Sequence, residues 1–112
     1  MLNSNWTKVC QLNDIAPNTG VCALFNDAQV AIFRIGATEQ LYAIDNYDPC
    51  GEANVLSRGI IGDHKGEWVV ASPLYKQQFK LTDGQCIEDD QIQLSTYPVT
   101  AVEGEIFLGL AQ

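Results

Sequence analysis

The side chains best suited to acid–base, thiol or metal chemistry in this sequence are one histidine and four cysteines. His64 stands in the polar stretch 62–66, where a catalytic base would need a nucleophile and an orienting group that the neighbouring residues do not supply. The cysteines show neither C-x-x-C spacing nor clustering, so with one histidine they make no convincing zinc site. A weak metal site at Cys50 and His64 stays open, on condition that their two loops meet in space. The four cysteines are Cys10, Cys22, Cys50 and Cys86.

Other common ligand-binding motifs are missing from the sequence. It contains no Walker-type and no G-x-G-x-x-G motif, so nothing indicates nucleotide binding. The acidic run 88–90 lacks the alternating oxygen ligands of a calcium loop, and we expect it to form a solvated tip. Cys10, Cys22 and Cys86 stand among apolar or turn residues and are expected to act as small hydrophobes. No export signal is visible, so we expect four reduced thiols in a cytoplasmic protein.

The charge balance limits the choice of partners. Fourteen acidic residues against six basic ones give a formal net charge of −8. Nucleic-acid binding relies on clustered lysine and arginine, whereas the six cations here are scattered along the chain, so DNA and RNA are poor candidates. The acidity serves either solubility or the steering of a basic protein partner.

The size of the chain allows one hydrophobic core. A chain of 112 residues and 12.3 kDa is expected to retain roughly 6,000 Å² of accessible surface when folded, about one-third of its unfolded surface. Residues 1–112 are therefore expected to form a single domain. The longest apolar runs, such as 21–25 and 30–33, are far shorter than the roughly 20 residues of a membrane span, so we expect no membrane partner.

Short stretches rich in β-branched and aromatic residues predict an all-β fold. We expect about eight to ten short antiparallel strands, arranged as a sandwich or small barrel, with little helix. Two-residue units such as Asn26-Asp27, Lys65-Gly66 and Glu103-Gly104 supply the positive φ angles of tight hairpins. The expected strands lie at 6–10, 21–25, 29–35, 40–46, 67–72, 78–81, 97–102 and 105–110.

Helix is expected at two short places only. Residues 13–16 could form one turn capped by Asn13 and ended by Pro17, and residues 52–58 could form another that stops at Gly59. The longest irregular segment is expected at 45–66. A segment of that length in a compact β domain indicates a present or former functional site.

Two loops carry the most specific signal in the sequence. The first reads N-Y-D-P-C-G at 46–51, and the second reads S-P-L-Y at 72–75 and continues to Phe79, Leu81 and Gly84. This layout resembles the Rieske-type iron–sulfur domain, in which one strand ends in N-x-C-P-H-x-G and a later one in C-P-x-H-x-x-x-F-x-L-x-x-G. The resemblance covers residues 6–110 and implies a Rieske-type arrangement of the strands.

None of the four ligand positions of that framework keeps its own ligand type, because Cys50, the one thiol among them, stands where an imidazole belongs. A Rieske [2Fe–2S] centre uses two cysteine thiolates on one iron and two imidazoles on the other. The resemblance places Asp48 and Cys50 at the ligand positions of the first loop. It places Ser72 and Tyr75 at those of the second. A serine hydroxyl is a weak, hard ligand, and a phenol with an ordinary pKa of about 10 stays protonated at neutral pH. We therefore expect no cluster, no metal and no catalytic residue in this chain.

Longer blocks of sequence resemble the small-subunit family of the assimilatory NAD(P)H-dependent nitrite reductase of bacteria. They include W-x-x-V-C at 6–10, G-V-C-A-L at 20–24, Q-V-A-I-F-R at 29–34, V-L-S-R-G at 55–59 and V-A-S-P-L at 70–74. The resemblance implies a part in the reduction of nitrite to ammonium for nitrate assimilation. It also implies that sirohaem, a [4Fe–4S] cluster, FAD and NAD(P)H belong to the large subunit. That subunit would be the partner, which this chain supports or regulates without catalysing a step itself.

The resemblance also implies where the large subunit would bind. In Rieske proteins the tip made by the two ligand loops faces the redox partner, so we expect the same tip to be the docking surface here. Tyr47, Leu74 and Tyr75 have the aromatic and apolar side chains that are typical of interface centres. Alternatively, Tyr47 and Tyr75 fill the space of the missing cluster, and both roles can hold. The expected docking set is Tyr47, Asp48, Pro49, Cys50, Ser72, Pro73, Leu74 and Tyr75.

Two other functions remain open from the sequence. One is a Rieske-type electron carrier with unusual ligation by Asp48, Cys50 and Ser72, which bound iron and visible colour would reveal. The other is a free-standing regulatory β domain, which would fail to co-purify with a large subunit.

Overall fold

The computed structural model describes residues 5–74 and 76–110. Within these residues the chain forms eleven short strands, all paired antiparallel, and two single-turn 3₁₀ helices. The helices are η1 (Leu12–Asp14) and η2 (Leu56–Arg58). The strands are β1 (Trp6–Gln11), β2 (Gly20–Phe25), β3 (Ala28–Arg34), β4 (Leu41–Asp45), β5 (Tyr47–Asp48), β6 (Ala53–Asn54), β7 (Ile60–His64), β8 (Glu67–Ala71), β9 (Gln78–Lys80), β10 (Val99–Val102) and β11 (Glu105–Gly109).

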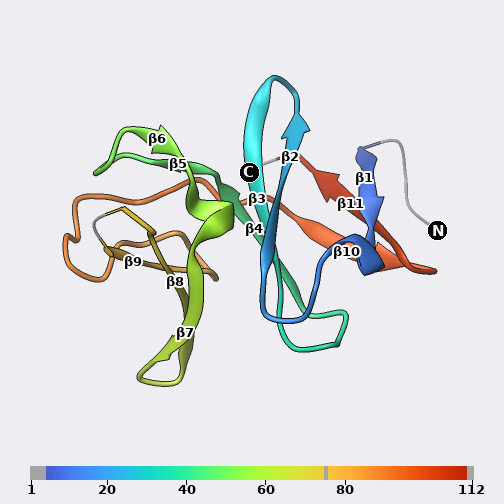
Figure 1. Cartoon of the computed structure of the whole chain (residues 1–112). Coiled ribbons are helices and arrows are strands. Elements are labelled where there is room, and N and C mark those ends of the chain that lie inside the picture. The colour runs from blue at the N-terminus through green and yellow to red at the C-terminus, as the bar shows by residue number, and fades with distance from the viewer. Residues whose placement is uncertain (1–4, 75, 111–112) are drawn as a thin grey trace.

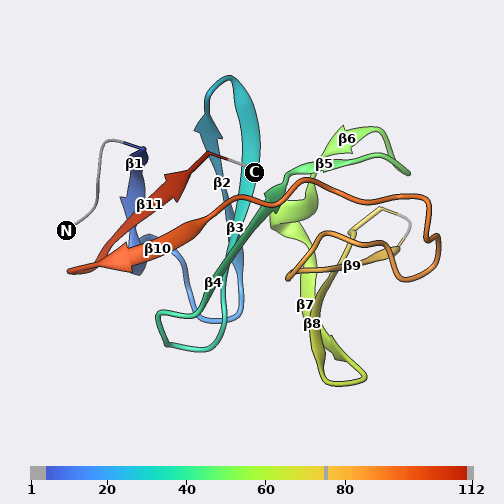
Figure 2. The same cartoon turned by 180° about the vertical axis from the view of Figure 1, so that it is seen from behind.

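Three three-stranded sheets form the body of the fold. The sheet β2-β3-β4 stands between the sheet β1-β11-β10 on one side and the sheet β7-β8-β9 on the other (Figure 1). The two-stranded ribbon β5-β6 lies on the side of β7-β8-β9, and the view from behind shows the same arrangement (Figure 2). The all-β, antiparallel fold predicted from the sequence is therefore confirmed.

The central strand β3 contributes to two hydrophobic cores. Successive side chains of a strand point to opposite faces of its sheet. Accordingly, Val30 and Ile32 pack with residues of β11, whereas Ala31 and Phe33 pack with residues of β8 and β9. All four are fully buried. A strand covered on both faces has no polar side, which explains why 30–33 is an uninterrupted apolar run.

Each of the eight predicted stretches contains a strand, but the prediction of an irregular segment at 45–66 is wrong. That segment holds the end of β4, the ribbon β5-β6, η2 and the whole of β7. Strand β7 contains Gly62 and Asp63, which are poor strand formers, and its pairing with β8 through the Lys65-Gly66 turn overrides that preference. His64 therefore lies in a strand opposite Glu67, and not in a polar turn.

Both helical predictions need correction. The first turn spans Leu12–Asp14, so it begins one residue early and ends before Ile15, not at Pro17. Its N-cap residue is Gln11 and not Asn13, and the Gln11 amide donates to Asp14 Oδ2 at 2.9 Å. The second turn is limited to η2, because residues 53–54 pair with 47–48 instead of joining the helix. It stops at Gly59 as predicted, and a Cβ at Gly59 would overlap the carbonyl oxygen of Ala71 on β8.

All four cysteines are free thiols, and one of them is exposed against expectation. Cys22 lies on β2, which is an edge strand of its sheet, and its Sγ lies 3.5 Å from both Gln29 Oε1 and Asn46 Nδ2. It therefore sits at a polar surface rather than acting as a small core hydrophobe. No helix in the described part of the chain is long and apolar enough to cross a membrane.

Candidate functional site: a tip made by two loops

The two loops singled out in the sequence meet at one end of the molecule. The first contains β5 and the turn that leads to β6, and the second connects β8 to β9. Both lie on the side of the central sheet that is away from β1 and β11 (Figures 1 and 2). We call residues 47–52 and 72–77 the tip, of which Tyr75 lies outside the described residues.

Asn46 anchors the first loop to the body of the fold. Its side chain is buried, with 1% of its surface exposed, and it is fully engaged in hydrogen bonds. Asn46 Oδ1 accepts from the Ser57 amide at 2.7 Å, and Asn46 Nδ2 donates to Gln29 Oε1 at 3.1 Å. The main-chain oxygen of Asn46 also accepts from the Leu56 amide at 3.0 Å. A buried amide is tolerated only when such partners are present, so this asparagine fixes the base of the loop relative to β3 and η2.

Asp48 and Ser72, at which the sequence resemblance expects cluster thiolates, contact each other directly. Asp48 and Ser72 are both buried, and the Ser72 hydroxyl donates to Asp48 Oδ2 at 2.5 Å. The Cys50 amide donates to Asp48 Oδ1 at 2.9 Å, and the Leu74 amide donates to Ser72 Oγ at 3.2 Å. Both carboxylate oxygens of Asp48 are therefore satisfied from within the tip. The hydrogen bond between Asp48 and Ser72 joins the two loops where a Rieske protein has iron.

The second loop is closed by hydrogen bonds of its own main chain, and its Leu74 contacts the first loop. The Ser72 amide donates to the carbonyl of Gln77 at 2.9 Å, and the Lys76 amide donates to the carbonyl of Ser72 at 3.1 Å. Leu74 lies over Gly51 of the first loop, where a Cβ would overlap its Cδ1. The role of Gly51 was not predicted, because the contact depends on how the loops meet.

The tip exposes apolar surface in spite of this internal closure. The exposed fraction is 42% for Tyr47 and 45% for Leu74. Pro73 is exposed as well, and Pro49 and Cys50 are half-buried. Two large apolar side chains held on fixed loops form a surface that another protein can cover.

The Cys50 thiol is in a poor environment for a metal ligand. Burial raises its pKa, and the negative charge of Asp48, Asp89 and Glu88, together with Cys86, raises it further. A thiol must lose its proton to bind iron or to act as a nucleophile, so Cys50 stays protonated and inert at neutral pH.

The tip does not fit a [2Fe–2S] cluster. Asp48 and Ser72 are hydrogen-bonded to each other through their side chains, so these oxygens are not free to bind iron. Cys50 has a protonated thiol at the position where the resemblance expects an imidazole. Nor does His64 approach Cys50, since the register of β7 with β8 puts His64 opposite Glu67, at the far end of β8 from Ser72. Among residues 5–74 and 76–110, no group of three or more histidine, cysteine, aspartate or glutamate side chains is placed to hold a metal ion.

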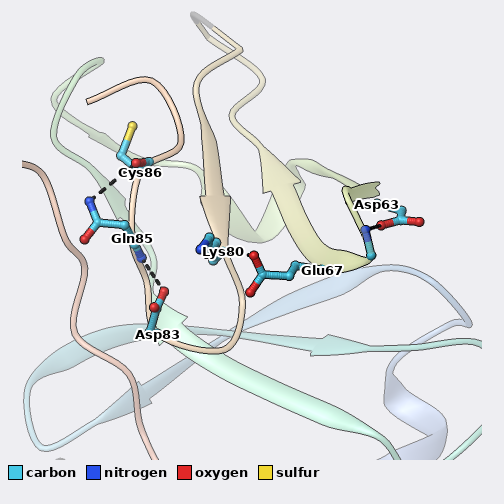
Figure 3. A network of polar contacts seen from close by, with 7 residues as sticks. Asp63, Glu67, Lys80, Asp83, Gln85 and Cys86 are labelled. Atoms are coloured by element: carbon cyan, nitrogen blue, oxygen red, sulfur yellow. Dashed lines mark hydrogen bonds and ion pairs between the residues drawn. The ribbon is translucent and has the colours of Figure 1, made fainter. Parts of the chain in front are cut away.

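Sequence reasoning also missed that the acidic run 88–90 lies beside the tip. The Ile87 amide donates to the carbonyl of Gln78 at 2.8 Å, and Glu88 Oε1 accepts from the Gln78 amide at 2.9 Å. Gln78 is the first residue of β9 and directly follows the second loop. The chain returns there through the turn 81–84, after which Gln85 bonds to Asp83 and to Cys86 (Figure 3). The contact comes from the bridge between Phe79 and Cys86, and no local sequence signal indicates that bridge.

With this geometry described, the similarity to known proteins decides the family. Residues 5–109 match the model of the Rieske-like [2Fe-2S] domain family. The nitrite reductase (NADH) small subunit of Escherichia coli K12 is 50% identical over 105 residues, which cover 94% of this chain and 97% of that protein. The chain belongs to the small-subunit family of NAD(P)H-dependent nitrite reductase. It is thus a subunit of an oxidoreductase whose catalytic activity lies with the large subunit.

Two further relatives add structural information. The NMR structure of the E. coli protein NirD superposes with a TM-score of 0.86 at 50% identity, covering 92% of this chain and 94% of that one. The nitrite reductase [NAD(P)H] large subunit of Klebsiella oxytoca is 41% identical over 107 residues, which are 96% of this chain but only 11% of that protein. A domain similar to this whole chain is thus built into a large-subunit polypeptide.

Proposed function

We propose that this chain docks through its tip on the large subunit of NAD(P)H-dependent nitrite reductase and carries no iron–sulfur cluster. The observation that carries the proposal is the exposure of Tyr47 and Leu74 on two loops that Asn46 and the Asp48–Ser72 hydrogen bond hold in place. A surface that is fixed before binding loses little conformational freedom on binding. The exposure of Tyr47 favours an interface role over that of a plug for the former cluster space.

The Klebsiella oxytoca relative supports physical association between the two subunits. Its large-subunit polypeptide contains a domain similar to 96% of this chain. Joining two proteins in one polypeptide keeps them at a high effective concentration, which is useful where they work in contact. In the present protein, the tip surface would provide that contact without a covalent link.

The proposed chemistry belongs to the large subunit. That subunit would hold sirohaem, a [4Fe–4S] cluster, FAD and the NAD(P)H site, and it would reduce nitrite to ammonium in nitrate assimilation. The present chain would support or regulate it through the docked tip. Four free thiols are typical of the cytoplasm, where we expect the complex to work.

Substitution of Leu74 with Asp tests the docking surface. A carboxylate would be buried without a partner in the interface, so retention of the chain on the immobilised large subunit should fall at least about tenfold. The matched control is Leu110→Asp, because Leu110 is also exposed but follows β11 on the sheet away from the tip. Tyr47→Ala and Tyr75→Ala extend the test across the tip.

Leu74→Asp protein that folds like the wild type and binds the large subunit equally well would rule out docking through the tip. A loss of binding in Leu110→Asp alone would place the interface on the opposite sheet instead. Circular dichroism and thermal unfolding of each variant provide the check on folding.

A further inference from the structure

The negative charge of the molecule is distributed unevenly, and part of it gathers around the tip. Of the six cations, Lys8 is paired with Glu105 at 2.6 Å and Lys80 with Glu67 at 3.0 Å. The guanidinium of Arg34 is buried and donates to main-chain carbonyls. Half of the positive charge is therefore used inside the fold or in local ion pairs. Of the other three cations, Arg58, Lys65 and Lys76, the exposed Lys76 lies in the second loop of the tip, so the charge there is mixed but has an excess of acids.

Acidic side chains border the tip from two directions. Glu52 is exposed in the turn between β5 and β6. On the other side, Glu88 is fixed to Gln78 by its carboxylate, and Asp89 and Asp90 follow it as exposed residues. We call Glu52, Glu88, Asp89 and Asp90 the acidic rim.

The electrostatic environment of Cys50 agrees with the position of Glu88 beside the tip. Cys50 belongs to the first loop, yet the charges of Glu88 and Asp89, which lie almost 40 positions further along the chain, raise its pKa. The geometry that places Glu88 there is its hydrogen bond from the Gln78 amide at 2.9 Å, directly after the second loop, and Asp89 follows Glu88 in the chain.

The geometry points to the chemistry of the partner surface: the tip fits an apolar recess on the large subunit that is bordered by lysine and arginine. This inference rests on the proposed function and specifies its partner surface. Tyr47 and Leu74 would fill the recess, and the acidic rim would face the basic border. Charges at the edge of an interface mainly accelerate association and select the partner, whereas the apolar centre sets the lifetime of the complex.

Charge reversal at the rim tests this inference against a matched control. The rim variant is Glu52→Lys with Asp89→Lys and Asp90→Lys. The control replaces exposed acids of the same local type away from the tip by lysine. Both variants raise the formal net charge from −8 to −2. Glu103 is the control for Glu52, because both have a positive φ. Asp63 is the control for Asp89, because the carboxylate of each accepts a main-chain hydrogen bond (Figure 3 shows Asp63). The third control position is the exposed Glu39 in the β3–β4 loop.

The association rate constant with purified large subunit, measured at low and at high salt, is the readout. At low salt the rim variant should associate at least about tenfold more slowly than the wild type, and the control should stay within about threefold. The salt dependence of the wild type should weaken in the rim variant alone.

An equal slowing of both variants would overturn the inference, because the effect would then come from total charge. Unchanged association of the rim variant would overturn it as well. If Leu74→Asp still abolishes binding in either case, docking through the tip stands and only the basic border is wrong. If Leu74→Asp also binds normally, the proposed function fails with it.

Discussion

At the scale of single residues, one hydrogen bond connects the two loops of the tip. A cluster holds two loops together through its ligands. Here the hydroxyl of Ser72 and the carboxylate of Asp48 make the connection at the same two positions. The Cys50 amide satisfies the second oxygen of Asp48, so the buried acid does not need a cation. One short hydrogen bond thus takes over a structural task that metal ligation has in Rieske proteins.

The value of that hydrogen bond can be measured with Ser72→Ala. The variant leaves Asp48 Oδ2 buried without its donor, and we expect the free energy of unfolding to fall by about 1–3 kcal/mol. Urea unfolding measures the change. Ser95→Ala removes an exposed hydroxyl and should cost less than about 0.5 kcal/mol. Equal losses in the two variants would mean that Ser72 and Asp48 contribute nothing beyond an ordinary surface contact.

At the scale of elements, one tyrosine fastens the segment before β10 to the central sheet. Tyr97 Oη donates to Asp45 Oδ1 at 2.8 Å, and the Ser95 amide donates to Asp45 Oδ2 at 3.0 Å. The Tyr97 amide also donates to the carbonyl of Ala43 on β4 at 2.9 Å. This connection joins β4 to the last hairpin, and one of its three hydrogen bonds depends on the proton of the phenol.

Alkaline pH should therefore weaken the connection. Burial, then the hydrogen bond to Asp45 and its charge, raise the pKa of Tyr97 to about 12. Because the folded-state pKa lies above the ordinary value of about 10, the stabilisation is complete below pH 10 and is lost as the pH rises towards 12. Urea unfolding between about pH 9 and 11.5 should show a shallower decline for Tyr97→Phe than for the wild type. Parallel declines would exclude Tyr97 as the titrating group.

The elements that could be predicted from the sequence are those whose residue types favour the structure that they adopt. The uninterrupted apolar run of β3 and the Glu103-Gly104 turn were both recognisable locally, and both are present. Strand β7 was not recognisable, because Gly62 and Asp63 disfavour a strand and the pairing with β8 overrides that preference. The exposure of Cys22 was also missed, since apolar neighbours along the chain do not reveal that β2 is a sheet edge.

For the candidate site, the sequence predicted that the loops of residues 46–51 and 72–75 come together, but not how their residues interact. The expectation that no cluster is bound rests on the residue types at 48, 50, 72 and 75. The contact between Asp48 and Ser72 spans 24 positions, and the approach of Glu88 to the tip depends on the return of the chain after β9. Neither contact can be predicted from neighbouring residues in the sequence, because each joins segments that are brought together by the fold.

At the scale of the whole molecule, the ends of the described chain lie away from the tip. Trp6 of β1 pairs with Gly109 of β11, so the two ends leave from the same end of this strand pair. Strand β1 lies across the central sheet from the tip, and β11 ends beside the central sheet (Figures 1 and 2). A covalent link to the large subunit at either end would therefore leave the tip free, in agreement with the fused relative from Klebsiella oxytoca.

A single-chain fusion should therefore be functional and should rescue a weakened tip. The longest dimension of the molecule is 39 Å, and a flexible Gly/Ser linker reaches that root-mean-square length at about 50 residues. Such a linker gives an effective concentration in the millimolar range, so Leu74→Asp should regain docking in the fused protein although it fails as a separate subunit. Measuring NAD(P)H-dependent nitrite reduction at nanomolar and micromolar enzyme compares the two forms. An inactive fusion that folds correctly would contradict one-to-one docking through the tip, whichever end carries the linker.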